Sequence, residues 1–347
     1  MESWQKSLSE SITSLDALAH VLPVDVESLL PVILRYPLRI TRYYLSLIHD
    51  KDDPIWRQCI PDRRELDQDG LSSDPLNEDQ WTVTRGLIHR YPDRVVWLAS
   101  SACSTLCRFC TRKNRMGKEG EPLNEPSLEA ALDYIVAKPD IREVILSGGD
   151  PLLLTDVELE KILTNLRHIS HLEIIRIHTR TPVTLPDRIT LNLCQMLKRY
   201  HPIYVNTQFN HPREITPQSS MACGLLADAG IPLGNQTVLL KGVNDDPGVM
   251  RDLMQKLLTL RVRPYYIHQM DLVRGTSHFR TPIQKGLSIM AGLRGHTSGM
   301  ATPSYVIDLP GGKGKVPLLS GEVKRQGNIL YLRNDLGEII EYPDCEG

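Results

Sequence analysis

Three cysteines stand close together in the stretch SACSTLCRFCTRKNR, residues 101–115 of the 347-residue chain. The C-x3-C-x2-C spacing places Cys103, Cys107 and Cys110 on one short segment. Thiolates bind zinc and iron–sulfur clusters, and structural zinc sites and ferredoxin clusters both take four protein ligands. No histidine lies between these cysteines, and an arginine-rich segment is a poor place for three core thiols. The spacing therefore indicates a metal centre whose fourth position belongs to another ligand.

A glycine-rich stretch near the other end, DLPGGKGKVPL (308–318), holds two lysines, Lys313 and Lys315. A phosphate-binding loop of the type G-x-x-x-x-G-K-[ST] requires Ser or Thr after the lysine. Val316 follows Lys315, so that interpretation fails. From the residues alone, an exposed basic turn is the remaining interpretation.

Alternating strand and helix patterns must position these residues. From residue 94, apolar or β-branched runs recur about every 30 residues with helical patterns between them, which predicts βαβ units and a parallel sheet. The six predicted strands are 94–100, 143–149, 173–180, 203–210, 232–240 and 264–272. The predicted helices include 127–139, 156–169, 191–200, 218–230 and 247–260. No G-x-G-x-x-G follows a strand, so the pattern favours a partial or closed barrel of the α/β class over a dinucleotide-binding sheet.

Polar residues follow several of these strands. They are Ser147, Gly148, Gly149 and Asp150 after the second strand, His178 to Arg180 after the third, Asn206 to Gln208 in the fourth and Asp271 at the end of the sixth. The carboxyl ends of parallel strands and the loops after them form the active-site face of such folds. The cysteine segment follows the first strand, so we expect it on the same face.

The chain divides into three predicted regions: an N-terminal helical region (1–88), a core (89–300) and a C-terminal segment (301–347). Within the first, residues 51–75 are polar and rich in turn formers, which predicts a surface connection. In the last, we expect a strand at 304–310, a flexible glycine-rich loop at 311–315, and a hairpin within 328–343 that turns at Asn334 and Asp335.

Composition excludes several classes of protein. Hydrophobic residues make up 41% and charged residues 24%, and the formal net charge is -2, so no global field favours nucleic acid or an anionic membrane. The N-terminus lacks a secretory pattern, and no apolar run is long enough to span a bilayer. The seven cysteines form no disulfide pattern, which favours a reducing cytoplasm. Cys194 and Cys223 lie in apolar helical patterns and are predicted to be core residues.

The cysteine spacing after the first strand, with SGGDP (147–151) after the second, resembles the radical S-adenosylmethionine (SAM) superfamily. The resemblance implies a partial (β/α)6 TIM-like barrel and a [4Fe–4S] cluster held by Cys103, Cys107 and Cys110. SAM would take the remaining iron through its amino and carboxylate groups. The resemblance also implies that the Ser147–Asp150 segment and Gln236 contact SAM.

The motif P-G-G-x-G-K resembles the lysine 2,3-aminomutase family. Seven further blocks in order extend the likeness over about residues 25–335: CTR, SGGDPL, RTPVTLPDRIT, NTQFNHPREIT, NQTVLLKGVND, PYYIHQMDL and GTSHFRTP. The resemblance implies that Lys315 forms the internal aldimine with pyridoxal 5′-phosphate (PLP). It also implies a PLP phosphate site at Arg90, Tyr91 and Arg94. Two departures are Lys313, where the family usually has glycine, and Gln208, where it commonly has histidine.

For the substrate, Arg112 matches the family's carboxylate-binding arginine, whereas Asp271 and Asp308 match the pair that reads the lysine ε-ammonium. Two converging carboxylates repel each other unless a cation lies between them. The implied reaction is a radical isomerisation that moves the amino group of L-lysine from C2 to C3. A 2,3-aminomutase for arginine and an enzyme that makes (R)-β-lysine for modification of translation elongation factor P remain alternatives. A non-catalytic iron–sulfur protein is a third.

The resemblance further implies a reductant such as flavodoxin or ferredoxin, and a homo-oligomer. Larger family members carry an intersubunit zinc site built partly from C-terminal cysteines. Only Cys345 stands near the end of this chain, so we predict that this zinc site is missing.

Overall fold

Ten strands form one sheet in the computed structural model, in the order β1 to β10 along the chain. The structure describes residues 3–68, 70–116, 125–318, 324–326, 329–333 and 338–343. Strands β3 to β9 are parallel: β3 (Arg94–Ser100), β4 (Glu143–Gly148), β5 (Ile174–His178), β6 (Ile203–Thr207), β7 (Leu233–Leu239), β8 (Val262–Gln269) and β9 (Ser304–Asp308). The first six confirm the predicted strands. The edge strands do not pair with each other within the described chain, so the sheet is a partial barrel, as predicted.

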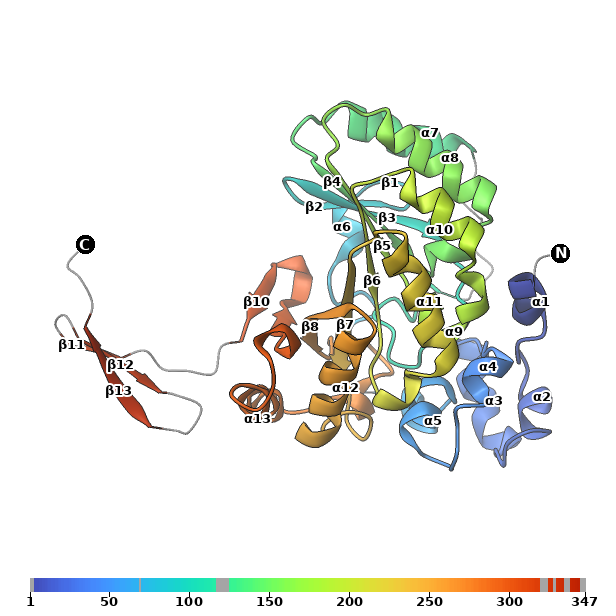
Figure 1. Ribbon diagram of the computed structural model, residues 1–347. Helices are drawn as coiled ribbons and strands as arrows, with labels where there is room; N and C mark the ends of the chain where they lie inside the picture. Colours follow the sequence, from blue (N-terminus) through green and yellow to red (C-terminus); the bar gives the residue numbers. More distant parts are fainter. Residues whose placement is uncertain are drawn as a thin grey trace.

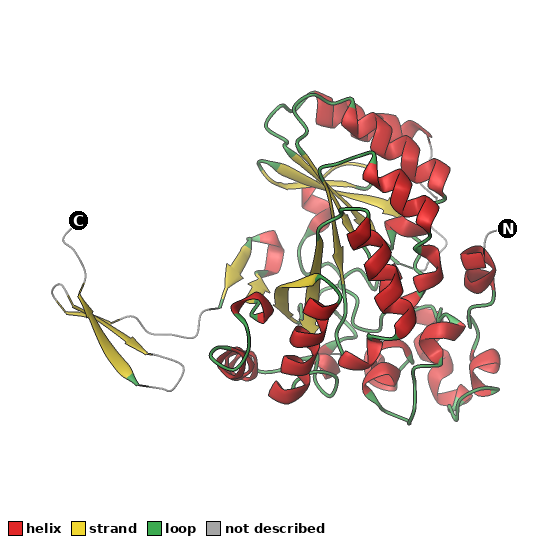
Figure 2. Ribbon diagram, in the orientation of Figure 1, coloured by secondary structure: helices red, strands yellow, loops and turns green. Residues whose placement is uncertain are grey.

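Helices connect the strands and lie along one face of the sheet (Figures 1 and 2). They are α7 (Glu125–Val136), α8 (Asp156–Arg167), α9 (Thr181–Thr184), α10 (Leu191–Lys198), α11 (Pro217–Asp228), α12 (Pro247–Thr259) and α13 (Ile283–Leu293). Caps define several starts: Thr155 and Glu158 form a capping box on α8, and Asp246 caps α12 with proline at its first position. Helix α13 is absent from the sequence-based prediction because glycines lower its helix propensity. Gly286 is needed there, since a Cβ would lie 2.2 Å from the Tyr305 ring.

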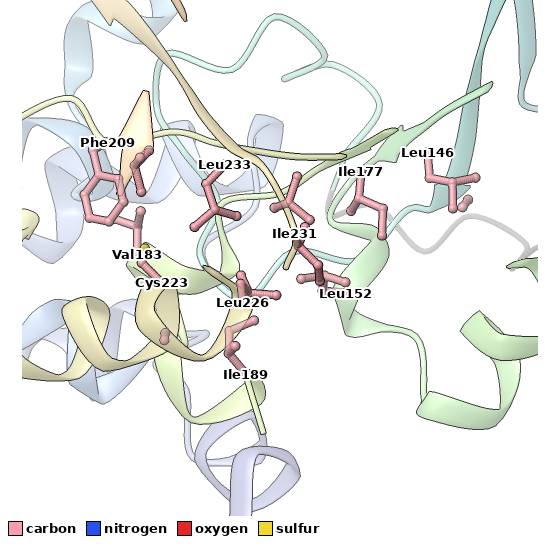
Figure 3. Close-up of a cluster of buried hydrophobic side chains, with 14 of the residues drawn as sticks. Leu146, Leu152, Ile177, Val183, Ile189, Phe209, Cys223, Leu226, Ile231 and Leu233 are labelled. Atoms are coloured by element: carbon pink, nitrogen blue, oxygen red, sulfur yellow. The ribbon is translucent and has the colours of Figure 1, made fainter. Parts of the chain in front are cut away.

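The main core lies between this sheet and the helices. Figure 3 shows Leu146, Ile177 and Leu233 from the strands and Cys223 and Leu226 from α11 within one cluster, and all are buried. Fully burying one such aliphatic side chain contributes about 1.5–3 kcal/mol. Cys194 and Cys223 are both 1% exposed, which confirms them as core residues.

The N-terminal region begins with short helices: α1 (Ser3–Ser9), α2 (Leu15–Ala19), α3 (Val26–Arg35), α4 (Arg42–Leu45), α5 (Pro54–Cys59) and α6 (Glu78–Trp81). The prediction of a surface connection at 51–75 is wrong in part, because α5 buries Ile55, Trp56 and Cys59. The turn formers that suggested a loop are a helix start: the Asp53 carboxylate accepts hydrogen bonds from the Ile55 and Trp56 amides, 2.8 Å each. Two further strands, β1 (Thr82–Thr84) and β2 (Leu87–Tyr91), form the antiparallel edge beside β3.

At the opposite edge, β10 (Lys315–Pro317) pairs antiparallel with β9. The stretch predicted as a flexible loop is a packed turn instead. Gly311 and Gly312 have φ of +74° and +71°, and a Cβ on Gly312 would lie 2.6 Å from the Leu76 carbonyl oxygen. The turn therefore holds Lys315 in a set place.

A separate three-stranded sheet contains β11 (Lys324–Gln326), β12 (Ile329–Arg333) and β13 (Ile339–Pro343). The antiparallel pairing of β12 with β13 confirms the predicted hairpin. Its turn at Asn334 and Asp335, and Cys345, lie outside the described residues. Among the residues that are described, no helix is long and apolar enough to cross a membrane.

Candidate active site

A cavity of about 900 Å³ runs along the parallel strands, from the loops at their carboxyl ends to residues at their amino ends such as Arg94 and Glu143. The predicted site residues all line it: Arg90, Tyr91, Arg94, Cys103, Cys107, Cys110, Arg112, Ser147, Gly148, Gly149, Asp150, Gln236, Asp271, Asp308 and Lys315. The volume is at the upper end of what ligand sites in proteins occupy. The fold thus brings the cysteine segment and the distant lysine segment into one space.

The three thiols lie near one another at one side of this cavity. Burial raises the pKa of Cys103 well above its ordinary value, and the neighbouring Cys110 adds to the effect. Burial and Cys107 raise the pKa of Cys110 to about 11. Within the described chain, no three His, Cys, Asp or Glu side chains converge on a single metal ion. In a [4Fe–4S] cluster each thiolate binds a different iron, so three thiols on one segment could hold such a cluster.

Backbone hydrogen bonds hold the cysteine segment from two directions. From the N-terminal region, the carbonyls of Arg39 and Gln58 accept from the amides of Leu106 and Arg108, both at 2.9 Å. From the loop after β4, the Asp150 amide donates to the Ala102 carbonyl at 2.7 Å, next to a bond from the Gly149 amide to the carbonyl of Ser100 at the end of β3. A Cβ on Gly149 would lie 2.2 Å from the Ala102 carbonyl oxygen, so only glycine allows this approach.

Asp150 was predicted to contact SAM, and the structure gives its carboxylate protein partners. It accepts hydrogen bonds from the Thr179 hydroxyl at 2.7 Å and from the Arg180 amide at 2.8 Å. Its side chain thereby joins the loops that follow β4 and β5.

A buried cluster of charged side chains ties the cysteine segment to the N-terminal region. The Glu65 carboxylate accepts a hydrogen bond from the Arg108 Nε at 2.9 Å and forms an ion pair with the Lys113 Nζ at 2.6 Å. The Glu65 side chain is 0% exposed. Despite burial, which raises it, the two cations bring the pKa of Glu65 below its ordinary value. Sequence-based reasoning missed this cluster because Glu65 lies about 40 residues before its partners in the chain.

We expect Glu65→Gln to lower the free energy of unfolding by about 3–5 kcal/mol, because it leaves two buried cations without a counter-charge. Urea denaturation of the apoprotein measures this change. The control is Glu173→Gln, which breaks an ion pair with Arg142 at the surface and is expected to change stability little. Equal stabilities of the two variants would contradict the assigned role of Glu65.

At the other side of the cavity, Lys315 and Asp308 are directly opposite each other across the β9–β10 pair. The Lys315 Nζ lies 2.5 Å from Asp308 Oδ2 and 3.2 Å from His268 Nδ1. Burial by itself raises the pKa of Asp308, but the hydrogen bond with His268 and the charge of Lys315 outweigh it. The pKa of this carboxyl therefore lies well below its ordinary value.

The second carboxylate, Asp271, lies in the loop after β8 and accepts a hydrogen bond from the Thr111 hydroxyl at 2.5 Å. Burial raises the pKa of Asp271, and the charge of Asp308 acts in the same direction. Thr111 opposes the shift. Two carboxylates that raise each other's pKa in one cavity favour a cation between them.

Arg112, two residues after Cys110, lines the cavity and pairs with Glu78 of α6. Its Nε and Nη2 lie 2.9 Å and 2.7 Å from the two Glu78 carboxylate oxygens. Because its guanidinium presents a fork of donors, Arg112 can bind a second carboxylate through the remaining nitrogen. Glu78 is a site residue that the sequence-based prediction lacks.

A group of cations lies on the β2–β3 edge of the cavity. Arg94 and Arg90 both stack on the Tyr91 ring, at 3.9 Å and 4.7 Å from its centroid. Arg90 also reaches to 3.6 Å from Asp308. The two guanidinium groups and the phenol form a donor set suited to a phosphate group.

The structure also adds His268 to the predicted residues. His268 and Tyr266 are two residues apart on β8 and both line the cavity. Their rings pack edge to face with centroids 5.4 Å apart. The sequence held a signal for this pair, because side chains two residues apart in a strand point to the same face and Tyr266 and His268 have this spacing within 264–272.

Comparison with known proteins gives two family matches. Residues 97–254 match the radical SAM superfamily, and residues 290–347 match the family described as lysine-2,3-aminomutase. An L-lysine 2,3-aminomutase of Fusobacterium nucleatum subsp. nucleatum is 48% identical, over 99% of this chain and 82% of that protein. One of Clostridium subterminale is 47% identical, over 98% and 84%. A glutamate 2,3-aminomutase of Clostridioides difficile is 43% identical, over 98% and 82%.

Proposed function

The chain belongs to the lysine 2,3-aminomutase family of radical SAM enzymes, and from that membership we propose that it is an isomerase that converts L-lysine to β-lysine by moving the amino group from C2 to C3. The observation that carries the substrate is the pair Asp271 and Asp308 beside Lys315 in one cavity. Relatives that act on lysine and on glutamate are similarly close, so overall identity does not separate the two substrates.

The lining residues fit the cofactors that this function requires. Cys103, Cys107 and Cys110 would hold a [4Fe–4S] cluster, with SAM beside the Gly148–Gly149 turn and Gln236. Lys315 would bind PLP covalently, with the PLP phosphate on Arg90, Tyr91 and Arg94. When bound, the cluster and SAM supply hydrogen-atom abstraction, and PLP supplies a carbonyl that binds amines covalently.

The charges of the cavity favour a substrate with a cationic side chain. Asp308 is paired with the Lys315 ammonium in this structure, so its position already accommodates a primary amine. A lysine ε-ammonium between Asp308 and Asp271 would relieve their mutual repulsion. Arg112 would bind the substrate carboxylate. A glutamate side chain would instead add a third negative charge.

Anaerobic reconstitution tests the proposal. The protein is loaded with iron, sulfide and PLP, then given SAM, dithionite and L-lysine, and the products are separated by chiral chromatography. We expect β-lysine as the product. The enantiomer formed distinguishes an L-lysine 2,3-aminomutase from an enzyme that makes (R)-β-lysine for modification of elongation factor P. Formation of 5′-deoxyadenosine without β-lysine would contradict the substrate, and L-arginine and L-glutamate are then compared under the same conditions.

We expect Asp271→Asn to lower kcat/KM for L-lysine on the order of 10²-fold, because losing one partner of a buried ion pair costs about 2–5 kcal/mol. The matched control is Asp187→Asn, an aspartate outside the cavity, which should keep wild-type kinetics. Steady-state rates with PLP and cluster content matched between proteins check this. An unchanged kcat/KM in D271N would refute the assignment of Asp271 to the substrate.

The proposal also covers the electron donor and the cellular compartment. The reaction needs a one-electron reductant, for which a flavodoxin or ferredoxin is proposed. A reducing compartment such as the cytoplasm is also proposed, because three of the seven cysteines are clustered and the other four are scattered, which is not a disulfide pattern. The homo-oligomer and the missing zinc site stay predictions.

A further inference from the structure

Arg180 brings a buried positive charge to the cysteine segment. It follows β5 and precedes α9, and its side chain is 8% exposed. Its Nη1 lies 2.8 Å from the Sγ of Cys107. The guanidinium also lies 5.3 Å from the centroid of the Phe109 ring, on the same segment. Arg180 is thus in direct contact with one of the three thiolates that would bind the cluster.

The rest of the guanidinium is fixed by partners from three other elements. Nη2 lies 2.7 Å from Glu214 Oε1, 2.8 Å from the Tyr44 hydroxyl and 2.6 Å from Gln58 Oε1, and its two N–H groups are shared among these three acceptors. Glu214 itself is 0% exposed and accepts a further hydrogen bond from Tyr44 at 2.7 Å. With this many partners, Arg180 cannot turn away from Cys107 without leaving buried polar groups unsatisfied.

Hydrogen bonds and charge next to a ligating sulfur tune an iron–sulfur cluster. Reduction adds one electron to the [4Fe–4S]²⁺ cluster and gives [4Fe–4S]⁺, so a nearby cation stabilises the reduced form more than the oxidised form. A nearby anion has the opposite effect. Glu214 pairs with the guanidinium nitrogen that does not contact Cys107, so its negative charge limits how far Arg180 raises the reduction potential of the cluster.

We propose that Arg180 is a positioning residue for Cys107, and that the Arg180–Glu214 pair sets the reduction potential of the cluster. This inference rests on the cluster of the proposed function but not on the identity of the amino-acid substrate. A purely structural role predicts a different outcome: loss of Arg180 would weaken the fold and leave the potential of any bound cluster unchanged.

The test compares Arg180→Met, Arg180→Lys and Glu214→Gln in the cluster-loaded protein without SAM or lysine. The fraction of reduced cluster is measured by EPR spin quantification at set potentials. The control is Arg188→Met, because Arg188 is also fully buried and ion-paired, with Asp156 at 2.8 Å, yet lies outside the cavity. Thermal denaturation of each variant reports the structural cost separately.

For R180M we expect the ratio of reduced to oxidised cluster at a fixed potential to fall on the order of tenfold, which corresponds to about 59 mV for one electron. R180K, which keeps the charge, should restore part of the difference, and E214Q should shift the ratio the other way. R188M should lose stability but keep the wild-type ratio. Wild-type ratios in R180M, R180K and E214Q would overturn the inference. If the wild-type chain itself binds no cluster, the proposed function fails instead.

Discussion

Replacing Lys315 with alanine is expected to abolish covalent binding of PLP and to lower turnover of L-lysine on the order of 10³-fold or more. The structure gives the physical reason. The Lys315 Nζ projects into the shared cavity, where Asp308 and His268 lie within 3.2 Å of it. A lysine held in place by the β9–β10 pairing, in one cavity with Arg90, Tyr91 and Arg94, is the arrangement that an aldehyde cofactor with a phosphate needs.

Lys313 provides a matched control for this experiment. It lies on the same turn but is exposed and does not line the cavity. Protein loaded with PLP is reduced with borohydride and digested, and the labelled lysine is identified by mass spectrometry. We expect the label on Lys315 in the wild-type protein and in K313A, and none in K315A. A label on Lys313, or full activity in K315A, would disprove the assignment.

The second large effect is expected for Cys110→Ala, which should prevent assembly of the cluster and bring activity below detection. Two remaining thiolates hold too few irons in place. The pKa of Cys110 is raised to about 11 by burial and by Cys107, so the thiol of the apoprotein is protonated at neutral pH. Metal binding must displace that proton, and we therefore expect reconstitution of the wild-type protein to weaken as the pH falls.

Iron and sulfide analysis, together with the EPR spectrum of the reduced protein, measures cluster assembly. Cys223→Ala is the control, because Cys223 is a buried thiol of α11 within the main core and does not line the cavity. C223A should keep the cluster with some loss of stability. Wild-type iron content in C110A would refute the three-cysteine site.

Local patterns predicted the central fold because strand and helix periodicity depends on near neighbours in the chain. The six strands and five connecting helices appear where the patterns place them, and strand ends converge as parallel strands must. Patterns failed where the local signal was ambiguous. Residues 51–75 contain a turn former, Asp53, that serves as a helix cap, and Gly312 packs the turn of residues 311–314 against Leu76.

The sequence by itself determined the chemistry that the chain can carry: three thiols at a set spacing, a lysine after a glycine-rich turn, and the two aspartates that accompany it. The tertiary structure decided which of these groups meet. The register of β9 with β10 places Asp308 opposite Lys315. The packing of the N-terminal region against the cysteine segment brings Glu65 to Arg108, and Gln58 and Tyr44 to Arg180. The physical reason is distance along the chain. Contacts such as Arg180 with Cys107 join residues 73 positions apart, and they form only when the loops that follow separate strands pack together at the carboxyl ends of the sheet.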